Sequence, residues 1–348
     1  MKAARLKAPK KIALEEILVP DISDTDVLVK VKYCGICGTD LRGFAAPGLI
    51  SVGAYMGHEF SGVITKVGKN VAGWQVGDRV VVNPNCFCGK CYACKHGDLE
   101  CCEHLIENSL GCLSDEKLPG AFSEFVRVPF ADQRLYPLPD ELSFEEGALA
   151  EPLASSLHAV RMSAFKTRDM VMVLGCGGIG LGVIAFLKDA GAGLIIATEI
   201  NEKRTELARK LGADFVFNPQ KVSNLREEVL KLTKGLGVNQ VFDCSGIPQA
   251  FQSASEFLRP KGQIVLVGII DKDVPIVPLN YQIGEFQLQA SFCYSDEFPL
   301  VISFLKNTKL PVKELITSKI KLSDIQEQGF NKLIQPGNSE IKILVSPE

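Results

Sequence analysis

Hydrophobic and polar positions alternate in two different ways along the chain, which divides it into two regions. Before residue 83, short segments rich in valine and isoleucine are separated by glycine and aspartate, which predicts a mostly-β domain. From Met170 onward, short continuous apolar runs alternate with helical stretches. Such runs are typical of parallel strands that are buried on both faces of a sheet. The strands expected in the first region are 26–32, 61–68 and 77–82.

The second region predicts a doubly wound parallel sheet, because strands and helices alternate along it. In such a sheet the ligand crevice lies at the carboxyl ends of the strands. After residue 284 the alternation weakens, and the pattern leaves open which domain the last segments join. The expected strands are 170–174, 194–198, 215–217, 239–243, 263–267, 286–294 and 341–345, and the expected helices are 181–190, 202–211, 225–233, 249–258, 297–306 and 322–333.

A glycine-rich loop follows the first strand of this second region. It has the pattern G-x-G-x-x-G from Gly175 to Gly180 and lies between a strand and a helix. Gly175 permits a tight turn, Gly177 lets the backbone approach a pyrophosphate, and Gly180 lets the helix pack closely on the strand. The helix amino terminus, with Gly178 and Ile179, adds free N–H groups for a phosphate. The loop therefore predicts a dinucleotide-binding site.

The next strand ends at Glu199, and its carboxylate bears on the choice of dinucleotide. A carboxylate there can bind the ribose hydroxyls of the adenosine and would repel a 2′-phosphate, which favours NAD over NADP. Arg204 lies close enough in sequence to keep NADP as an alternative. Gly246 and Gly268 follow the ends of later strands, so we expect them beside the cofactor, with ordinary turn glycines as the alternative.

Six of the twelve cysteines lie between residues 83 and 102. Four of them have the spacing C-x2-C-x2-C-x7-C, which fits one tetrahedral Zn²⁺ with a closed sulfur shell. A closed shell has no position for substrate, so this zinc would be structural. Cys101 is an alternative fourth ligand. The four expected ligands are Cys88, Cys91, Cys94 and Cys102.

A second group of possible metal ligands is spread over three segments. Cys37, His58 and Glu151 supply one thiolate, one imidazole and one carboxylate, and Glu59 adds a second carboxylate beside the histidine. Three protein ligands leave zinc a fourth position for water or substrate, which is typical of a catalytic site. Cys34 and Cys37 could instead form a redox pair, but the βαβ context of such a pair is missing.

Composition and charge narrow the classes of function. The chain of 348 residues is long enough for two domains with their own cores. A formal charge of -3 without a basic cluster argues against nucleic acid as a partner. No apolar run is long enough to span a membrane. A chain of this kind keeps its thiols reduced, so we expect a cytoplasmic protein that acts on a small molecule.

These motifs occur in the order seen in the zinc-containing medium-chain alcohol dehydrogenases, which the whole chain resembles. The branch of sorbitol, butanediol and threonine dehydrogenases is the most similar, because its members carry the Gly-His-Glu and Glu-Pro pairs. The motifs that carry the resemblance are Cys37-Gly38-Thr39-Asp40, Gly57-His58-Glu59, the four-cysteine lobe, Glu151-Pro152 and the glycine loop.

The resemblance implies a division into domains and an assembly. A GroES-like, mostly-β catalytic domain would comprise residues 1–153 and 291–348, with the structural zinc lobe at 83–102. A Rossmann domain would comprise residues 154–290. The active site would lie in the cleft between the domains, and the protein would be a homodimer or homotetramer.

The resemblance also implies an oxidoreductase that needs two zinc ions per chain and NAD, and that interconverts a small polar secondary alcohol and its ketone by hydride transfer. Cys37 and His58 would be ligands of the catalytic zinc, and Glu59, Glu151 or a water would complete its shell. Thr39 matches the hydroxyl that passes on the alcohol proton.

Two positions depart from the pattern of the relatives and bear on the substrate. Arg42 stands where many relatives have histidine, and Cys293 stands where sorbitol dehydrogenases have arginine. A vicinal diol or polyol-like alcohol is expected, with a polyol phosphate, a cyclitol or L-threonine as alternatives. The competing class is a non-catalytic zinc protein that senses NAD, but such a protein needs no open-site group of cysteine, histidine and carboxylate.

Overall fold

The chain folds into two units, described from a computed structural model that covers residues 1–46, 50–112 and 118–348. The first unit comprises Met1–Pro152, Phe298–Asn307 and Ile316–Glu348, and the second comprises Leu153–Glu297 and Thr308–Leu315. The carboxyl-terminal strands thus belong with the amino-terminal ones. The expected domain boundaries lie at 153/154 and 290/291, whereas the corresponding boundaries between the two units lie at 152/153 and 297/298.

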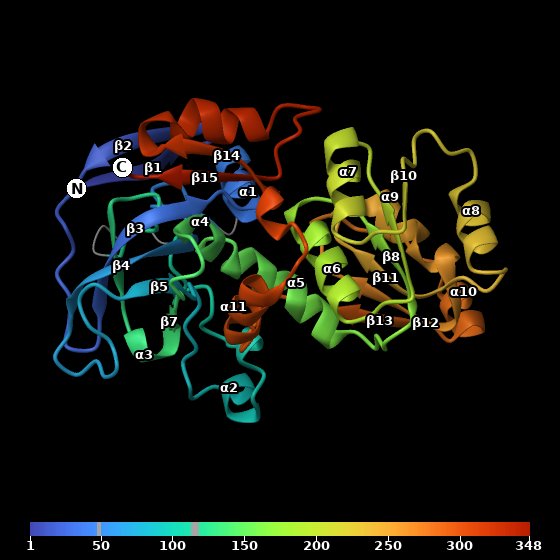
Figure 1. The fold of residues 1–348 in the computed structure, drawn as a ribbon, viewed down its shortest axis with the longest axis horizontal. Coiled ribbons are helices and arrows are strands. Elements are labelled where there is room, and N and C mark those ends of the chain that lie inside the picture. The colour runs from blue at the N-terminus through green and yellow to red at the C-terminus, as the bar shows by residue number, and fades with distance from the viewer. Residues whose placement is uncertain (47–49, 113–117) are drawn as a thin grey trace. The chain divides into compact units, whose positions relative to one another are not determined.

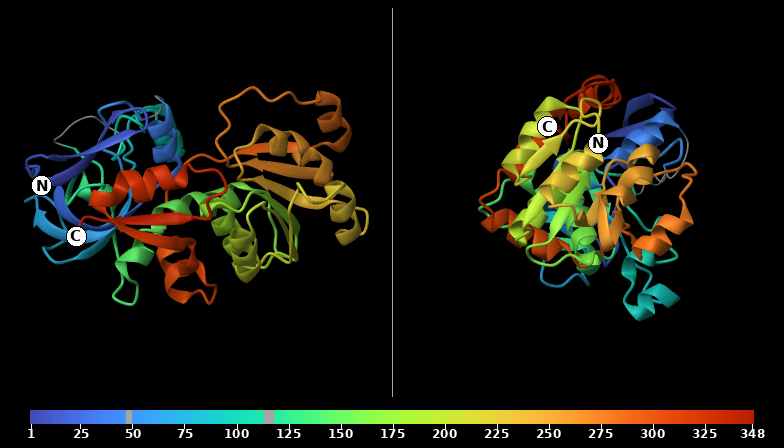
Figure 2. Two further views of the ribbon diagram at one scale, coloured as in Figure 1. Left: turned by 90° about the horizontal axis from the view of Figure 1, so that it is seen from above. Right: turned by 90° about the vertical axis from the view of Figure 1, so that its right-hand side faces the viewer.

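The first unit is built mainly on antiparallel strands, which gives the mostly-β domain that the alternating pattern predicts. A two-stranded sheet is formed by β1 and β2, and a seven-stranded sheet has the order β14-β15-β3-β4-β5-β7, with β6 paired to β3. Figures 1 and 2 show the last strands of the chain beside the first ones. The strands are β1 (Lys2–Ala8), β2 (Lys11–Glu16), β3 (Val27–Gly35), β4 (Glu59–Val67), β5 (Arg79–Val82), β6 (Phe125–Val128), β7 (Leu135–Pro137), β14 (Ile316–Lys321) and β15 (Lys342–Ser346).

Short helices connect these strands, and one apolar core holds them together. Val27, Val29 and Val31 of β3 alternate with less buried residues and are fully buried in this core. The helices of this part are α1 (Gly38–Ala45), α2 (Tyr92–His96), α3 (Ala131–Arg134), α4 (Phe144–Gly147) and α11 (Phe298–Asn307), with a 3₁₀ turn at Leu99–Cys101; α5 (Ala150–Met162) begins here and continues into the second unit.

The helix expected at 322–333 is not a regular α-helix. It consists of a 3₁₀ turn at Leu322–Asp324 and a π-helix at Ile325–Asn331. Ile325, Gly329 and Phe330 are all buried. In the wider π-turn, positions i, i+4 and i+5 lie on one face, whereas an α-helix would turn position i+5 away. Burial of these three residues in the core therefore favours a π-helix, which the apolar spacing alone does not indicate.

The second unit confirms the predicted doubly wound sheet. Its six strands are all parallel, in the order β10-β9-β8-β11-β12-β13 (Figure 1). β8, the first of these strands in the chain, lies in the middle of the sheet next to β11, the fourth. Because the glycine loop follows β8, the point where the strand order reverses lies beside this loop. The strands are β8 (Met170–Leu174), β9 (Leu194–Thr198), β10 (Phe215–Phe217), β11 (Val238–Asp243), β12 (Leu258–Leu266) and β13 (Gln287–Ala290).

The helices of the second unit follow the strands as expected, with small differences at their ends, except that the helix at Pro278–Gly284 was not expected. The helix expected at 249–258 ends as a 3₁₀ turn, and β12 begins earlier than expected. The helices are α6 (Gly178–Asp189), α7 (Glu202–Lys210), α8 (Leu225–Leu232), α9 (Pro248–Ser253) and α10 (Pro278–Gly284), with 3₁₀ turns at Ala254–Phe257 and Val312–Leu315.

Candidate active site and metal centres

Cys37 occupies the turn between β3 and α1, where local hydrogen bonds fix its side chain. Its sulfur accepts a hydrogen bond from the backbone N–H of Thr39 at 3.4 Å. Its own N–H donates to Oδ2 of Asp40 at 2.9 Å, which completes a capping box. The thiol therefore lies at a helix amino terminus, where the unpaired N–H groups favour a negatively charged group.

His58 and Glu59 lie at the start of β4, and they meet Cys37. The ligand atoms of Cys37, His58 and Glu59 all lie within 4.8 Å of one another. The preceding Gly57 has a φ of +99°, and a Cβ there would lie 2.6 Å from the backbone nitrogen of Phe122, so only glycine fits this turn. A sulfur, a nitrogen and an oxygen donor in one buried group fit a three-ligand zinc site.

The surroundings of His58 favour positive charge. Nδ1 of His58 lies 3.6 Å from Oδ1 of the buried Asp40, and neither atom has a hydrogen-bond partner among the described residues. Burial opposes protonation, but the charges of Asp40 and Cys37 outweigh it and raise the pKa of His58 well above its ordinary value. With Nδ1 turned to Asp40, Nε2 is the nitrogen left for an ion. A cation fits this site.

Glu151 does not join the group of atoms within 4.8 Å. It lies in the first turn of α5, is buried, and contributes negative charge that raises the pKa of His58. Thr39 is half-buried in the first turn of α1. The three segments that the sequence singled out thus belong to the same unit, with Glu59 rather than Glu151 inside the tight group.

Lys342 contacts this group from β15, although no motif in the sequence indicates it. Its Nζ lies 2.6 Å and 2.5 Å from the two carboxylate oxygens of Glu59 and donates to the carbonyl of Ile36 at 3.1 Å. Burial favours the neutral amine, but the charges of Glu59 and Cys37 raise the pKa of Lys342 above its ordinary value. The one available signal was a lysine inside the apolar run 341–345.

The four cysteines of the lobe also come together. The sulfurs of Cys88, Cys91, Cys94 and Cys102 lie within 4.8 Å of one another. Cys101 is exposed and lies outside this group. Backbone N–H groups of residues in the lobe donate to these sulfurs at 3.4 to 3.5 Å, as suits thiolates. Such hydrogen bonds, most strongly that from the N–H of Lys90, lower the pKa of Cys88 to about 6, whereas burial and the neighbouring thiol of Cys91 raise the pKa of Cys94 to about 12. The lobe fits a four-sulfur zinc site.

The glycine loop has the geometry that its pattern predicts. Gly175 has a φ of +89°, and a Cβ on Gly180 would lie 2.0 Å from the carbonyl oxygen of Gly175. A Cβ on Gly177 or Gly178 would meet nothing within 4 Å. Ile179, in the first turn of α6, is half-buried. The first and last glycines are thus needed for packing, and the middle ones face open space that a pyrophosphate can enter.

Backbone N–H groups hold Glu199 at the end of β9. Its two oxygens accept hydrogen bonds from the N–H groups of Cys176, Ile200 and Asn201 at 2.8 to 3.0 Å. Three donated hydrogen bonds fix the carboxylate before any ribose arrives. Arg204 lies in α7. Burial and the charge of Glu199 raise the pKa of the Cys176 thiol in the loop, and the charge of Arg204 opposes this rise.

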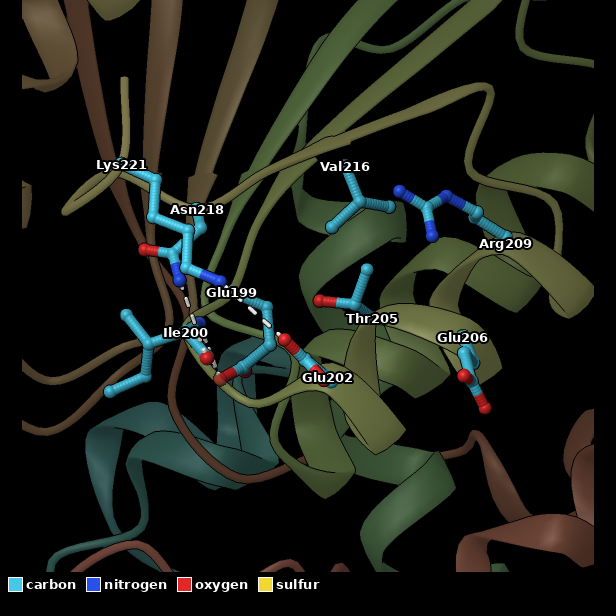
Figure 3. A pocket seen from close by; sticks show the side chains of 9 residues that line it. All are labelled: Glu199, Ile200, Glu202, Thr205, Glu206, Arg209, Val216, Asn218 and Lys221. Carbon is cyan, nitrogen blue, oxygen red and sulfur yellow. Dashed lines mark hydrogen bonds and ion pairs between the residues drawn. The ribbon is translucent and has the colours of Figure 1, made fainter. Parts of the chain in front are cut away.

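A pocket of about 320 Å³ opens beside Glu199 (Figure 3). Three carboxylates, of Glu199, Glu202 and Glu206, line it together with two cations, of Arg209 and Lys221. Lys221 pairs with Glu202 at 3.4 Å. This excess of carboxylates gives the lining a negative charge, which disfavours a phosphate group in the pocket.

Gly246 and Gly268 lie against each other at the ends of β11 and β12. Gly246 has a φ of +65°, and a Cβ on Gly268 would lie 2.3 Å from the backbone nitrogen of Gly246. A Cβ on Gly175 would lie 3.0 Å from Cα of Ser245. The two turns therefore pack under the glycine loop, where bulkier residues would not fit.

Among the described residues, none of the helices has the length and apolar character that crossing a membrane requires.

Comparison with known proteins places these features in one family. The family model described as "Alcohol dehydrogenase GroES-like domain" matches residues 23–140. The family model described as "Zinc-binding dehydrogenase" matches residues 178–307. The chain is 39% identical to (R,R)-butanediol dehydrogenase of Bacillus subtilis, with 100% of both chains covered. It is 32% identical to sorbitol dehydrogenase of the same organism, with 100% of this chain and 97% of that protein covered. The crystal structure of 2R,3R-butanediol dehydrogenase from Bacillus subtilis matches with a TM-score of 0.90 at 38% identity and covers 100% of this chain and 99% of that one.

The matches span both units, and the two metal groups and the glycine loop lie within them. The chain therefore belongs to the zinc-containing medium-chain alcohol dehydrogenases, as its motifs predict, and is a zinc- and NAD(H)-dependent oxidoreductase.

Proposed function

We propose that this dehydrogenase oxidises a vicinal diol at one of its secondary hydroxyl groups. The observation that carries this proposal is the buried group of Cys37, His58 and Glu59, with the further carboxylate of Glu151 in the same unit. Two carboxylates near the reacting hydroxyl suit a substrate with a second hydroxyl group. The relatives at 39% and 32% identity are named for a diol and for a polyol, which supports the same class.

Each residue of the site has a distinct role in this proposal. When bound, zinc supplies Lewis acidity and NAD accepts the hydride. Cys37, His58 and Glu59 would hold the ion, and Asp40 keeps the imidazole ring of His58 in place from 3.6 Å. Thr39 follows Cys37 by two positions and would carry the proton of the substrate hydroxyl towards solvent.

The cofactor roles rest on the second unit. Gly177, Gly178 and the amino terminus of α6 would receive the pyrophosphate, because they leave open space beside free N–H groups. Glu199 would accept hydrogen bonds from the ribose hydroxyls of the adenosine. Its charge, together with the neighbouring carboxylates of the pocket, would exclude the 2′-phosphate of NADP.

Initial rates of NADH formation test both parts of this proposal. With NAD and a panel of vicinal diols, polyols, polyol phosphates, cyclitols and L-threonine, we expect the highest kcat/KM for a vicinal diol, by about tenfold or more. With the best substrate, NADP should give a kcat/KM roughly a hundredfold below that of NAD, because like charges would meet at Glu199. A maximum for L-threonine or a polyol phosphate would replace the substrate assignment, and comparable use of NADP would remove the role of Glu199.

We also propose that the protein forms a homodimer through β13, with a homotetramer as the larger alternative. β13 is the last strand of its sheet, and its Leu288 is 49% exposed. Ile283 and Phe292, nearby in the chain, are 76% and 51% exposed. An edge strand with apolar neighbours is a template for pairing with a second copy. Leu288→Lys should convert a dimer into a monomer by sedimentation analysis; a monomeric wild-type protein at micromolar concentration would contradict the assembly.

We place the protein in the cytoplasm, because none of the twelve cysteines, all of which lie among the described residues, forms a disulfide, as suits a reducing compartment. Cell fractionation tests this placement, and recovery outside the cytoplasmic fraction would overturn it.

A further inference from the structure

Asp243 places a buried carboxyl group at the point where the strand order of the second unit reverses. It is the last residue of β11 and lies opposite Leu174, the last residue of β8, and opposite Leu266 of β12. Asp243 is fully buried. The glycine loop begins directly after Leu174, so this carboxyl group lies beside the start of the loop.

Hydrogen bonds direct the carboxyl group towards the turn that packs under the glycine loop. Its Oδ1 accepts from the N–H and from the hydroxyl of Ser245, at 3.0 Å and 2.6 Å. Ser245 lies against the loop, because a Cβ on Gly175 would lie 3.0 Å from Cα of Ser245. The backbone of Asp243 is also held, since its carbonyl accepts from the N–H of Gly268 at 2.7 Å. The carboxyl group therefore has one fixed orientation.

The second oxygen of this group, Oδ2, has no partner. Among the described residues, no group donates a hydrogen bond to it and no cation pairs with the carboxyl group. A buried carboxylate without a cation is disfavoured. Burial therefore raises the pKa of Asp243, although the hydrogen bonds from Ser245 oppose this rise. The group keeps its proton to a higher pH than an exposed aspartate does.

The other titratable groups in this region do not compensate a charge on the carboxyl group. Cys244 follows it in the chain and Cys176 lies in the glycine loop, and burial raises the pKa of both thiols, so both stay neutral. Glu199 and Arg204 act on Cys176 with opposite signs. The paired positions of β8 and β12 are leucines, and α6 carries no charged side chain before Lys188.

We propose that the carboxyl group of Asp243 sets the affinity for the dinucleotide: its charge weakens binding of the pyrophosphate, and a proton on it strengthens binding. The proposal rests on the cofactor roles assigned above to the glycine loop. A pyrophosphate on the loop brings negative charge to the end of the sheet towards which the carboxylate is turned. Leu174 and Cys176, which lie between them in the chain fold, are buried, so the two charges repel with little screening.

The consequence is a cofactor affinity that depends on pH. Bound pyrophosphate favours the neutral carboxyl group and so raises the pKa of Asp243 further. The affinity is therefore highest below the pKa of the free protein, falls as the pH rises towards the pKa of the complex, and is constant above it. Weaker binding at higher pH also speeds release of the dinucleotide, which matters where product release limits turnover.

Removal of the charge tests the sign of this effect. Asp243→Asn keeps the size of the side chain and an oxygen for Ser245. At about pH 8 it should bind ADP-ribose about tenfold more tightly than wild type does, whereas loss of a merely structural contact would weaken binding. Calorimetric titration measures this affinity, and the difference should narrow towards about pH 5, where wild type is protonated. Equal or weaker binding by Asp243→Asn at the higher pH would overturn the proposal.

Asp214→Asn is the matched control, because it removes the same charge from the other end of the sheet. Asp214 is exposed and directly precedes β10, so it lies at the amino ends of the strands, away from the glycine loop. Its affinity for ADP-ribose should stay within about twofold of that of wild type. A gain as large as that of Asp243→Asn would attribute the effect to net charge and would overturn the proposal.

Proton uptake by the wild-type protein gives a test that does not depend on the folding of a variant. ADP-ribose is titrated in buffers of different ionisation enthalpy between about pH 5 and about pH 8, a range in which its pyrophosphate keeps its charge. Binding should take up a fraction of a proton per chain in wild type and none in Asp243→Asn. Absence of uptake in wild type would overturn the proposal.

Adenosine separates this role from the proposed function, because it lacks the pyrophosphate. It should bind wild type and Asp243→Asn equally. If ADP-ribose binds wild type no more tightly than adenosine does, the glycine loop holds no pyrophosphate, and both the cofactor roles and the role of Asp243 are removed. If ADP-ribose binds more tightly than adenosine but equally to wild type and Asp243→Asn, the role of Asp243 alone is removed.

Discussion

Replacement of His58 by alanine is expected to lower kcat/KM by at least about a thousandfold, which corresponds to about 4 kcal/mol. The imidazole is the one nitrogen donor in the group formed with Cys37 and Glu59. Its loss leaves two anionic ligands, and the ion that would polarise the substrate hydroxyl is no longer held. The zinc content should fall from two ions per chain to one, because the four-cysteine lobe is untouched.

NADH binding separates this effect from unfolding. The glycine loop and Glu199 belong to the second unit, whereas His58 belongs to the first, so fluorescence titration should give an unchanged Kd for NADH. His104→Ala is the matched control, because the half-buried His104 has a side chain that is 44% exposed and pairs with Glu107 outside both metal groups. That variant should keep its activity and both zinc ions. Survival of activity in His58→Ala would remove the catalytic zinc assignment.

Local signals in the sequence were sufficient to predict most strands and helices of the second unit. The apolar run of β8 and the glycine loop after it are contiguous, so strand, turn and helix could be placed from one stretch of residues. β9 and β10 also coincide with their expected bounds. α10 was not expected, because it buries no side chain and therefore leaves no apolar periodicity in the sequence.

Features that depend on distant parts of the chain could not be predicted in the same way. The contact between Lys342 and Glu59 joins residues 283 positions apart, so no spacing rule relates them. The presence of Glu59 rather than Glu151 in the group of atoms within 4.8 Å depends on the register of β4 and the start of α5, which residue types do not specify. The π-helix at Ile325–Asn331 likewise depends on distant parts of the chain, because it forms where the core buries Ile325, Gly329 and Phe330 together.

Cys102→Ser and Cys101→Ser are expected to have opposite outcomes, although the two residues are neighbours. The sulfur of Cys102 lies in the four-sulfur group and accepts a hydrogen bond from the N–H of Cys88 at 3.4 Å, whereas Cys101 is exposed. Cys102→Ser should therefore lose the lobe zinc, and the metal content should fall from two ions per chain to one. Cys101→Ser should keep both ions by elemental analysis.

Loss of the lobe zinc should disorder the lobe without unfolding the unit that carries it. The buried Arg134 holds the chain before and after residues 88–102 independently of the metal, because its guanidinium donates to the carbonyls of Pro84 and Asn108 at 3.0 Å and 2.6 Å. Limited proteolysis of Cys102→Ser should therefore cleave within residues 88–102 about tenfold faster than in wild type or Cys101→Ser, since cleavage follows the population of the open lobe. Equal cleavage in all three proteins would show that the zinc does not hold the lobe, and loss of the lobe zinc in Cys101→Ser would move the fourth ligand to that residue.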